Sequence, residues 1–426
     1  MRKKSYFALI ILLNSTHSQA FNLVTAWQSA LENAPEYASA QAVKRIDSEA
    51  ENQALAELLP SINGNSRYQE QPQSNANDSS TYGWNVQLSQ SIYNSSKWNQ
   101  YQKGKVRSTI SDLVLASKSD ELLKKVTQYY FELLIADEQL QLIIATKRSL
   151  QQQLNQAEAM YKKGAGSIID YYDAQSGFDE IITEEVSARN QYVVAFNKLQ
   201  HLTGRMSGEL EAAKAFQPID IHDSLSWNDM ALNKNAGLLA KKANITEAEY
   251  EVKSIKGQHL PTLDVNAGYQ NNINKREQGG TDLRYRDKGH YMTLGVNIPI
   301  FSGGGTSSKV RESVARRDQL EQEYFYAKDQ ISLEIETLIS ALRTNTQQVQ
   351  SFSKLVSTNK MKLDATEIGL KAGVRTQTDL IKAQQDYLEA QKKLAEAKHS
   401  YISGYLTLVI SSGDTENLAQ KAMAFF

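Results

Sequence analysis

The sequence predicts an α+β membrane protein in which four β-strands per chain belong to a barrel, and long coiled-coil helices continue that barrel. Three observations lead to this fold class. The 426-residue chain is written as two similar halves, each half contains a pair of strand-like segments with alternating polarity, and each half contains helical patterns of unusual length. We therefore expect two structural repeats per chain.

Charge and composition exclude several classes of protein. Lys and Arg total 47 against 48 for Asp and Glu, so the chain has no overall charge that would favour nucleic acid. Cysteine is absent, which excludes disulfides, thiolate metal sites and a lipid anchor on an N-terminal cysteine. The six histidines have no metal-ligand spacing. We expect no metal and no cofactor.

Residues 1–20 have the pattern of a secretory signal peptide. Three basic residues at positions 2–4 precede the apolar run Tyr6–Leu13, and small residues occupy the cleavage-type positions before Phe21. The run is shorter than the roughly 20 residues that a membrane helix needs, and no later stretch reaches that length. We expect a mature chain that begins at Phe21 and has no membrane helix.

Two internal similarities define the repeats. Leu59–Ile62 (Leu-Pro-Ser-Ile) recurs 201 residues later as Leu260–Leu263 (Leu-Pro-Thr-Leu), and the segment Tyr161–Asp170 recurs 209 residues later as Leu370–Asp379. Extra residues between the two matches fall in the second strand pair, where a loop lengthens. The expected division of the chain is a signal peptide at 1–20, repeat 1 at 21–204, a linker at 205–227, repeat 2 at 228–413 and a C-terminal segment at 414–426.

A β-hairpin is predicted at about 61–93 and another at about 262–301. In both, apolar or aromatic residues alternate with small polar ones, which is typical of a membrane barrel with lipid outside and water inside. A single such strand fits a soluble core equally well. The barrel is favoured by long polar loops expected at 69–81 and 270–290, and by aromatic residues near the loop ends that would form an interfacial girdle. These girdle residues are Tyr68, Tyr82, Trp84 and Tyr269.

Long helical hairpins are predicted at about 94–204 and 306–413. Apolar residues recur every seven positions from Val126 to Tyr161, and the row lying 209 residues later keeps the same register from Ile335 to Leu370. A helix without proline over residues 94–163 would be roughly 100 Å long. Shorter helices are expected at 22–58 and 228–258. The hairpin tips are assigned to Gly164, Gly166 and Gly373, where glycine ends a helix.

Four strands cannot close a barrel by themselves. About eight strands is the smallest number seen, and unpaired strand edges cannot lie in lipid. Several copies of the chain must therefore share one barrel, and two, three or four copies all satisfy this requirement.

The order of strand, strand and long helical hairpin, written twice, resembles the TolC family of outer-membrane efflux proteins. Local stretches support the resemblance, among them Gln90–Trp98, Gly257–Asp264 and Pro299–Gly304. Many members carry a lipid on an N-terminal cysteine, which this chain lacks. The resemblance implies a homotrimer with a 12-stranded β-barrel, placed in the outer-membrane lipid of a Gram-negative bacterium with its helical part in the periplasm.

The resemblance also implies partners and a gate. The partners are a periplasmic adaptor (membrane fusion) protein and an inner-membrane transporter, as in tripartite efflux or type I secretion of drugs or unfolded proteins. The gate residues would be an ion pair between Asp170 and Arg375, a lumenal ring of Asp379, and Lys382 in place of a second acidic ring. The tyrosine that supports the pair in the family falls at Leu370, which predicts a weaker lock. An ordinary solvated loop is the simpler interpretation of the same charges.

Two functions other than export are compatible with parts of the sequence. A periplasmic coiled-coil adaptor or structural protein would explain the heptads but not four amphipathic strands. An enzyme is disfavoured because the glycine-rich segment Gly303–Lys309 lacks the ending of a phosphate-binding loop. No acid is marked as a catalyst, so no catalytic residue is assigned. The sequence does not identify the cargo.

Overall fold

The computed structural model describes residues 21–71, 79–205, 210–214, 216, 218–219, 224–278 and 281–426. The expected signal peptide and much of the expected linker lie outside these residues. The chain divides into two compact units. Unit 1 comprises Met1–Ala38, Ser119–Asn228 and Glu334–Phe426, and unit 2 comprises Ser39–Lys118 and Asp229–Leu333.

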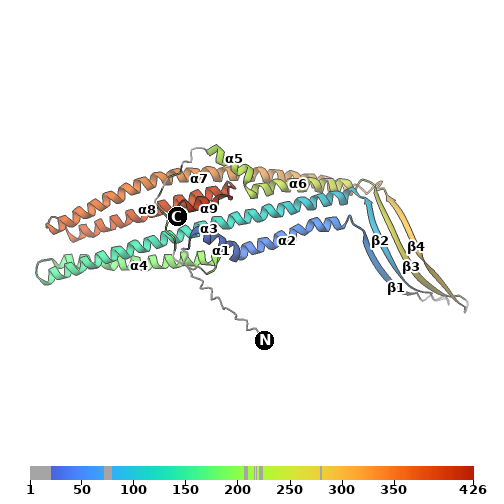
Figure 1. Cartoon of the computed structure of the whole chain (residues 1–426), viewed down its shortest axis with the longest axis horizontal. Coiled ribbons are helices and arrows are strands. Elements are labelled where there is room, and N and C mark those ends of the chain that lie inside the picture. The colour runs from blue at the N-terminus through green and yellow to red at the C-terminus, as the bar shows by residue number, and fades with distance from the viewer. Residues whose placement is uncertain are drawn as a thin grey trace, which may run out of the picture. The chain divides into compact units, whose positions relative to one another are not determined.

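Unit 2 contains one antiparallel sheet with the strand order β1-β2-β3-β4 (Figure 1). The strands are β1 (Ser61–Gln71), β2 (Ser79–Tyr93), β3 (Thr262–Gln278) and β4 (Thr281–Asn297). Each repeat supplies one hairpin, and β2 pairs with β3 where the two repeats meet. Among the described residues, β1 and β4 each keep one edge without a strand partner.

Strand register places the expected girdle residues on one face of the sheet. Directly opposite residues share a face, and Tyr68 lies opposite Tyr82 while Tyr269 lies opposite Val86. The rings of Trp84 and Tyr269 are in contact, with 5.6 Å between their centroids. All four aromatic side chains are exposed in the single chain. We call this side the apolar face of the sheet; it also carries Ile62, Leu88, Leu263, Val265, Met292, Leu294 and Val296.

The second hairpin differs from the prediction at both ends. Residues 270–290 were expected to be a loop, but β3 and β4 stay paired to Gln278 and Thr281. Polar side chains did not prevent this, because the ladder is formed by backbone groups that every residue except proline supplies. At the other end, β4 stops at Asn297 although the alternation continues to Ile300. Pro299 has no N–H to donate to a ladder.

The shorter helices are each broken once. The segment expected as one helix at 22–58 forms α1 (Leu23–Asn33) and α2 (Pro35–Ala56), because Pro35 suits only the first turn of a helix. The segment expected at 228–258 belongs to α5 (Ser224–Lys234) and α6 (Ala236–Gly257). Asn235 begins α6 as its cap, accepting the amide of Leu238 at 3.0 Å.

Two long helical hairpins follow the strands. They consist of α3 (Ser95–Lys162) with α4 (Ile168–Thr203), and α7 (Gly305–Lys371) with α8 (Gln377–Ser411). In unit 1, α4 lies beside α3 and α8 lies beside α7 (Figure 1). The short helix α9 (Leu418–Met423) follows. No described helix combines the length and the apolar character needed to cross a membrane.

The predicted heptad rows form the core of unit 1. Val126, Leu133, Ile335 and Leu342 are each at most 2 % exposed. Where α1 meets α3, the hydroxyl of Tyr130 donates to the carbonyl of Phe21 at 3.2 Å, and burial raises the Tyr130 pKa above its ordinary value. The first described residue is therefore tied to the long helices.

Candidate functional site at the helical hairpin tips

Both hairpin tips in unit 1 are closed by a glycine with a left-handed backbone. Gly164 has φ +70° and Gly373 has φ +76°. Each donates its amide to the carbonyl three residues back, at 2.9 Å and 3.0 Å respectively. A side chain would strain this conformation, which ends the helix and turns the chain. Gly166 matters for space instead, since a Cβ there would lie 3.1 Å from the Cβ of Met160.

The two helices that leave the tips begin with the same capping box. In α4, Ser167 is the cap and donates its amide to Asp170 at 3.3 Å. In α8, Thr376 is the cap and donates its amide to Asp379 at 3.1 Å. Each cap accepts a helical amide in return. Two of the predicted gate carboxylates thus occupy equivalent positions, 209 residues apart, and stabilise the first turns of α4 and α8.

Positive charge surrounds Asp379. Hydrogen bonds from the backbone and side chain of Thr376 lower the pKa of Asp379, and the charges of Arg375 and Lys382 lower it further. The carboxylate is therefore ionised at neutral pH. Arg375 and Lys382 are both exposed. Among the ion pairs of the described residues, none joins Asp170 to Arg375, so that lock stays a prediction for the assembled protein.

The two hairpins of one chain are joined by polar contacts that recur every seven residues along α8. Each contact connects a side chain of α8 to a carboxylate of the first hairpin, and together we call them the heptad ladder. The contacts are Thr378 to Asp173 (2.5 Å), Gln385 to Glu180 (2.8 Å), Lys392 to Glu184 (2.8 Å) and His399 to Glu138 (2.8 Å). Sequence reasoning missed them, although the polar residues at this spacing on α8 were a usable signal.

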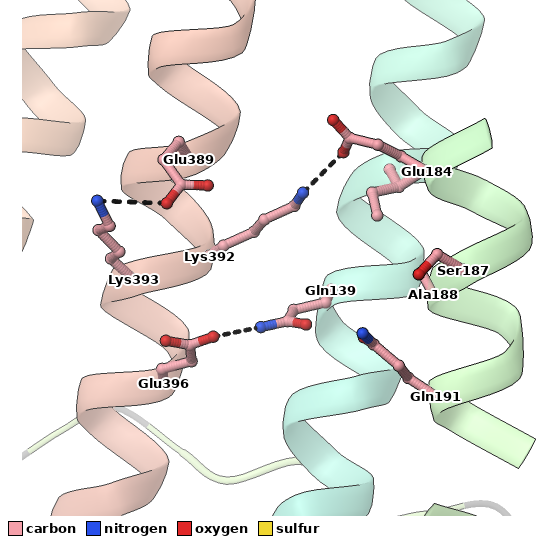
Figure 2. Close-up of a pocket in the computed structure, with 10 residues that line it drawn as sticks. Gln139, Glu184, Ser187, Ala188, Gln191, Glu389, Lys392, Lys393 and Glu396 are labelled. Atoms are coloured by element: carbon pink, nitrogen blue, oxygen red, sulfur yellow. Dashed lines mark hydrogen bonds and ion pairs between the residues drawn. The ribbon is translucent and has the colours of Figure 1, made fainter. Parts of the chain in front are cut away.

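A groove of about 270 Å³ lies over part of the ladder, between α8 on one side and α3 and α4 on the other (Figure 2). Its two lysines are already in ion pairs: Lys392 with Glu184 at 2.8 Å and Lys393 with Glu389 at 3.2 Å. Gln139 donates across it to Glu396 at 2.7 Å. The side chains that line the groove therefore hold the two hairpins together, through the Lys392–Glu184 ion pair and the Gln139–Glu396 hydrogen bond.

Beneath the ladder the hairpins share an apolar core. Ile381 and Leu388 of α8 pack with Leu140, Ile143 and Ile181 of the first hairpin. The helices approach closely at Gly177, where a Cβ would lie 3.1 Å from the Cγ2 atom of Ile381. The tip region is thus a packed unit with a polar outer layer rather than two independent hairpins.

The residues brought together here contain no arrangement for catalysis that the geometry supports. They contain ion pairs, helix caps and a packed seam, which can hold helices together or release them. The family of outer membrane efflux proteins matches residues 26–205 and 227–414. The chain belongs to this family.

Curated relatives of this outer membrane efflux protein span nearly its whole length. It is 26 % identical to the outer membrane protein TolC of Vibrio cholerae over 397 residues, covering 91 % of this chain and 90 % of that protein. It is 24 % identical to the proteases secretion protein PrtF of Dickeya chrysanthemi, covering 100 % of this chain and 96 % of that protein. A third, the alkaline protease secretion protein AprF of Pseudomonas aeruginosa, is 24 % identical, with 96 % and 87 % covered.

Solved structures agree in fold. The outer-membrane channel CmeC of Campylobacter jejuni superposes with a TM-score of 0.79 at 15 % identity, covering 95 % of this chain and 90 % of that chain. CusC gives a TM-score of 0.79 at 14 % identity, with 92 % of both chains covered. The predicted fold class is confirmed: four strands and long helices per chain in a repeated pattern. The family match makes the chain an outer-membrane transport protein of Gram-negative bacteria and not an enzyme, and it sets aside the adaptor alternative.

The gate roles of Asp170, Arg375, Asp379 and Lys382, and the girdle role of the four aromatic residues, stay predictions. The bounds expected for the signal peptide, the two repeats and the linker stay predictions as well.

Proposed function

We propose that three copies of this chain close a 12-stranded barrel in the outer membrane, and that their helical hairpins continue it into the periplasm as an export duct. The observation that carries the proposal is the sheet itself. It has four strands, two open edges and one apolar face, so it can satisfy its backbone in lipid only by joining further copies.

We further propose that a periplasmic adaptor protein and an inner-membrane transporter deliver the cargo. The relatives include proteins named for protease secretion and the TolC proteins. Both unfolded proteins and drugs fit a continuous duct, and the transporter would select between them. The signal peptide 1–20 belongs to the same proposal, because a duct in the outer membrane must first be secreted.

Export is tested in a Gram-negative strain that lacks its own outer-membrane duct. Expression of the chain should restore antibiotic resistance, secretion of a type I substrate, or both. A matched pair of variants in β4 checks that insertion is required. Leu294→Asp puts a charge on the apolar face and should abolish rescue, whereas Thr293→Asp lies on the opposite face and should be tolerated.

Rescue of neither phenotype by the native chain, despite its presence in the outer-membrane fraction, would contradict the proposal. Full rescue by Leu294→Asp would contradict the assignment of that face to lipid.

A further inference from the structure

A band of cations continues the apolar face of the sheet toward the loop ends of the strands. Along β4, the face that carries Met292 further along also carries Lys288, Arg286 and Arg284, because side chains two residues apart share a face. Lys275 of β3 lies directly opposite Arg284. We call these four residues the basic band.

The basic band is exposed and available. All four side chains are exposed in the single chain. Arg286 donates its Nε hydrogen to Asn271 at 3.1 Å, which holds the guanidinium against the sheet and leaves its terminal nitrogens free of that contact. Among the residues whose side chains the structure describes, no ion pair involves a member of the band.

Asp287 does not neutralise the band from within. Asp287 lies between two members in sequence but on the opposite face, where it accepts a hydrogen bond from Gln270 at 2.7 Å. The strand alternation therefore separates Asp287 from the four cations of the band.

The predicted aromatic girdle would set the band at the boundary between lipid and water. Asn271, which lies opposite Lys288, also lies opposite the girdle residue Trp84 on its other side. Going along β4 from Val296, the face is apolar as far as Met292, continues through His290, and is basic from Lys288 to Arg284. Cations facing hydrocarbon are costly, but at this level they face headgroups.

We propose that the basic band binds the phosphate groups of anionic lipid headgroups in the leaflet around the loop end of the barrel. Guanidinium and ammonium groups beside an apolar surface match a ligand with both acyl chains and phosphate. Conduction does not require this site, so the inference goes beyond the proposed export function; it rests only on insertion of the apolar face in a bilayer.

Trp84 provides a built-in reporter. It lies two strand spacings from Lys288, roughly 10 Å, which is close enough for a brominated lipid bound at the band to quench its fluorescence. The full-length protein is reconstituted in phosphatidylcholine, and quenching by brominated phosphatidic acid is compared with quenching by brominated phosphatidylcholine. The chain has 4 tryptophans, so Trp84→Phe gives the background from the others.

We expect phosphatidic acid to be preferred at least about threefold, as charge near a membrane surface allows. The preference should fall at high salt, because screening weakens exposed charges. Replacement of all four band residues by Gln should remove it. Four exposed lysines of α6 and α7 form the matched control, and their replacement should leave it intact; these are Lys242, Lys253, Lys256 and Lys309.

Equal quenching by the two lipids in the native protein would overturn the proposal, and so would an unchanged preference in the Gln variant. Retention of the preference in Arg284→Lys/Arg286→Lys supports binding through charge. Inorganic phosphate, added at constant ionic strength, should not compete; competition would show a site for free anions instead of lipid. Bilayer conductance of the Gln variant is measured in parallel, so a loss of insertion is distinguished from a loss of lipid preference.

Discussion

Thr378 of α8 donates its hydroxyl hydrogen to the carboxylate of Asp173 in α4, with 2.5 Å between Oγ1 and Oδ2. This hydrogen bond joins the two hairpins of one chain within two turns of their tips. The contact is exposed, so water competes with it, and we expect it to contribute about 0.5–1.5 kcal/mol to holding the tips together.

Removal of this contact should loosen the closed state. We expect Thr378→Val to raise resting conductance in planar bilayers by about tenfold, and Asp173→Asn to do the same to a smaller extent because an amide still accepts. The double variant should add little to Thr378→Val, since both remove one interaction.

Asp179→Asn is the matched control for the Thr378 experiment. Asp179 is in the same helix but accepts from Gln175 within α4 at 2.8 Å, so it holds no second helix. Equal leakage from this control and from Thr378→Val would show that the inter-hairpin bond has no special role.

Arg375 is predicted to tie the tips through Asp170 in the closed assembly. We expect Arg375→Ala to raise resting conductance or antibiotic sensitivity severalfold, because the ion pair that it would remove crosses between hairpins. Lys371→Ala is the control, since Lys371 pairs within α7 with Glu367 at 2.8 Å. Unchanged conductance and antibiotic sensitivity in Arg375→Ala would show that the Asp170–Arg375 pair is not part of the gate.

We expect Asp379 and Lys382 to determine the ion selectivity of the duct. Threefold symmetry would turn each into a ring, and a Lys382 ring one turn from the Asp379 ring would offset its field. We expect Lys382→Asp to increase cation selectivity and block by divalent cations, and Asp379→Asn to abolish both.

Asp379 also caps α8, so its substitution needs a structural control. Thr376→Ala removes the cap partner while keeping the carboxylate charge, and should leave selectivity near that of the native protein. Reversal potentials in a salt gradient give the answer. Native selectivity in both Asp379→Asn and Lys382→Asp would place the two residues outside the conduction path.

The fold could be predicted because the sequence patterns that indicate it occur in both halves of the chain. The Leu-Pro motifs, the two alternating hairpins and the heptad rows each occur twice, and the burial of Val126 and Ile335 at 0 % follows directly from the register. The extent of β3 and β4 could not be predicted, because polar residues such as Arg286 and Asn274 give no period-two signal although their backbone groups pair. The basic band could not be recognised from the sequence for the same reason.

The tip contacts were partly predictable. The turn glycines and helix starts are local features, whereas the bond from Thr378 to Asp173 depends on how two hairpins 205 residues apart in sequence are packed. A residue pattern on one helix does not name its partner on another. The capping role of Asp170 and Asp379 could have been recognised from Ser167 and Thr376 three positions earlier.

The contact between Glu138 and His399, which lies farthest from the tips in the heptad ladder, should be sensitive to acid. The pKa of Glu138 is lowered, chiefly by its hydrogen bond with His399 and against the opposing effect of burial. Because the pKa of Glu138 is lower in the folded protein than its ordinary value of 4.5, the ionised carboxylate stabilises the fold at pH values above 4.5. This stabilisation is lost as the pH falls through the folded-state pKa.

We therefore expect acidification from pH 6 to pH 4 to lower the thermal midpoint more in the native protein than in Glu138→Gln, by about 1–2 °C, because Glu138 is half-exposed although His399 is buried. Glu396→Gln is the control, because Glu396 has an uncharged partner in Gln139. A larger acid effect in Glu138→Gln than in the native protein would reverse the sign and contradict the account.

In the proposed trimer, the free edges of β1 and β4 join between copies to close one barrel of three chains. Because the chain contains no cysteine, a pair introduced at Asn65 in β1 and at each of 293–295 in β4 in turn reports this junction without background. The measurement is the mass of the oxidised, detergent-purified protein on a denaturing gel. We expect at least one pair to give a covalent series that ends at the trimer. Monomer in all three pairs, or a series ending at two or four chains, would contradict it.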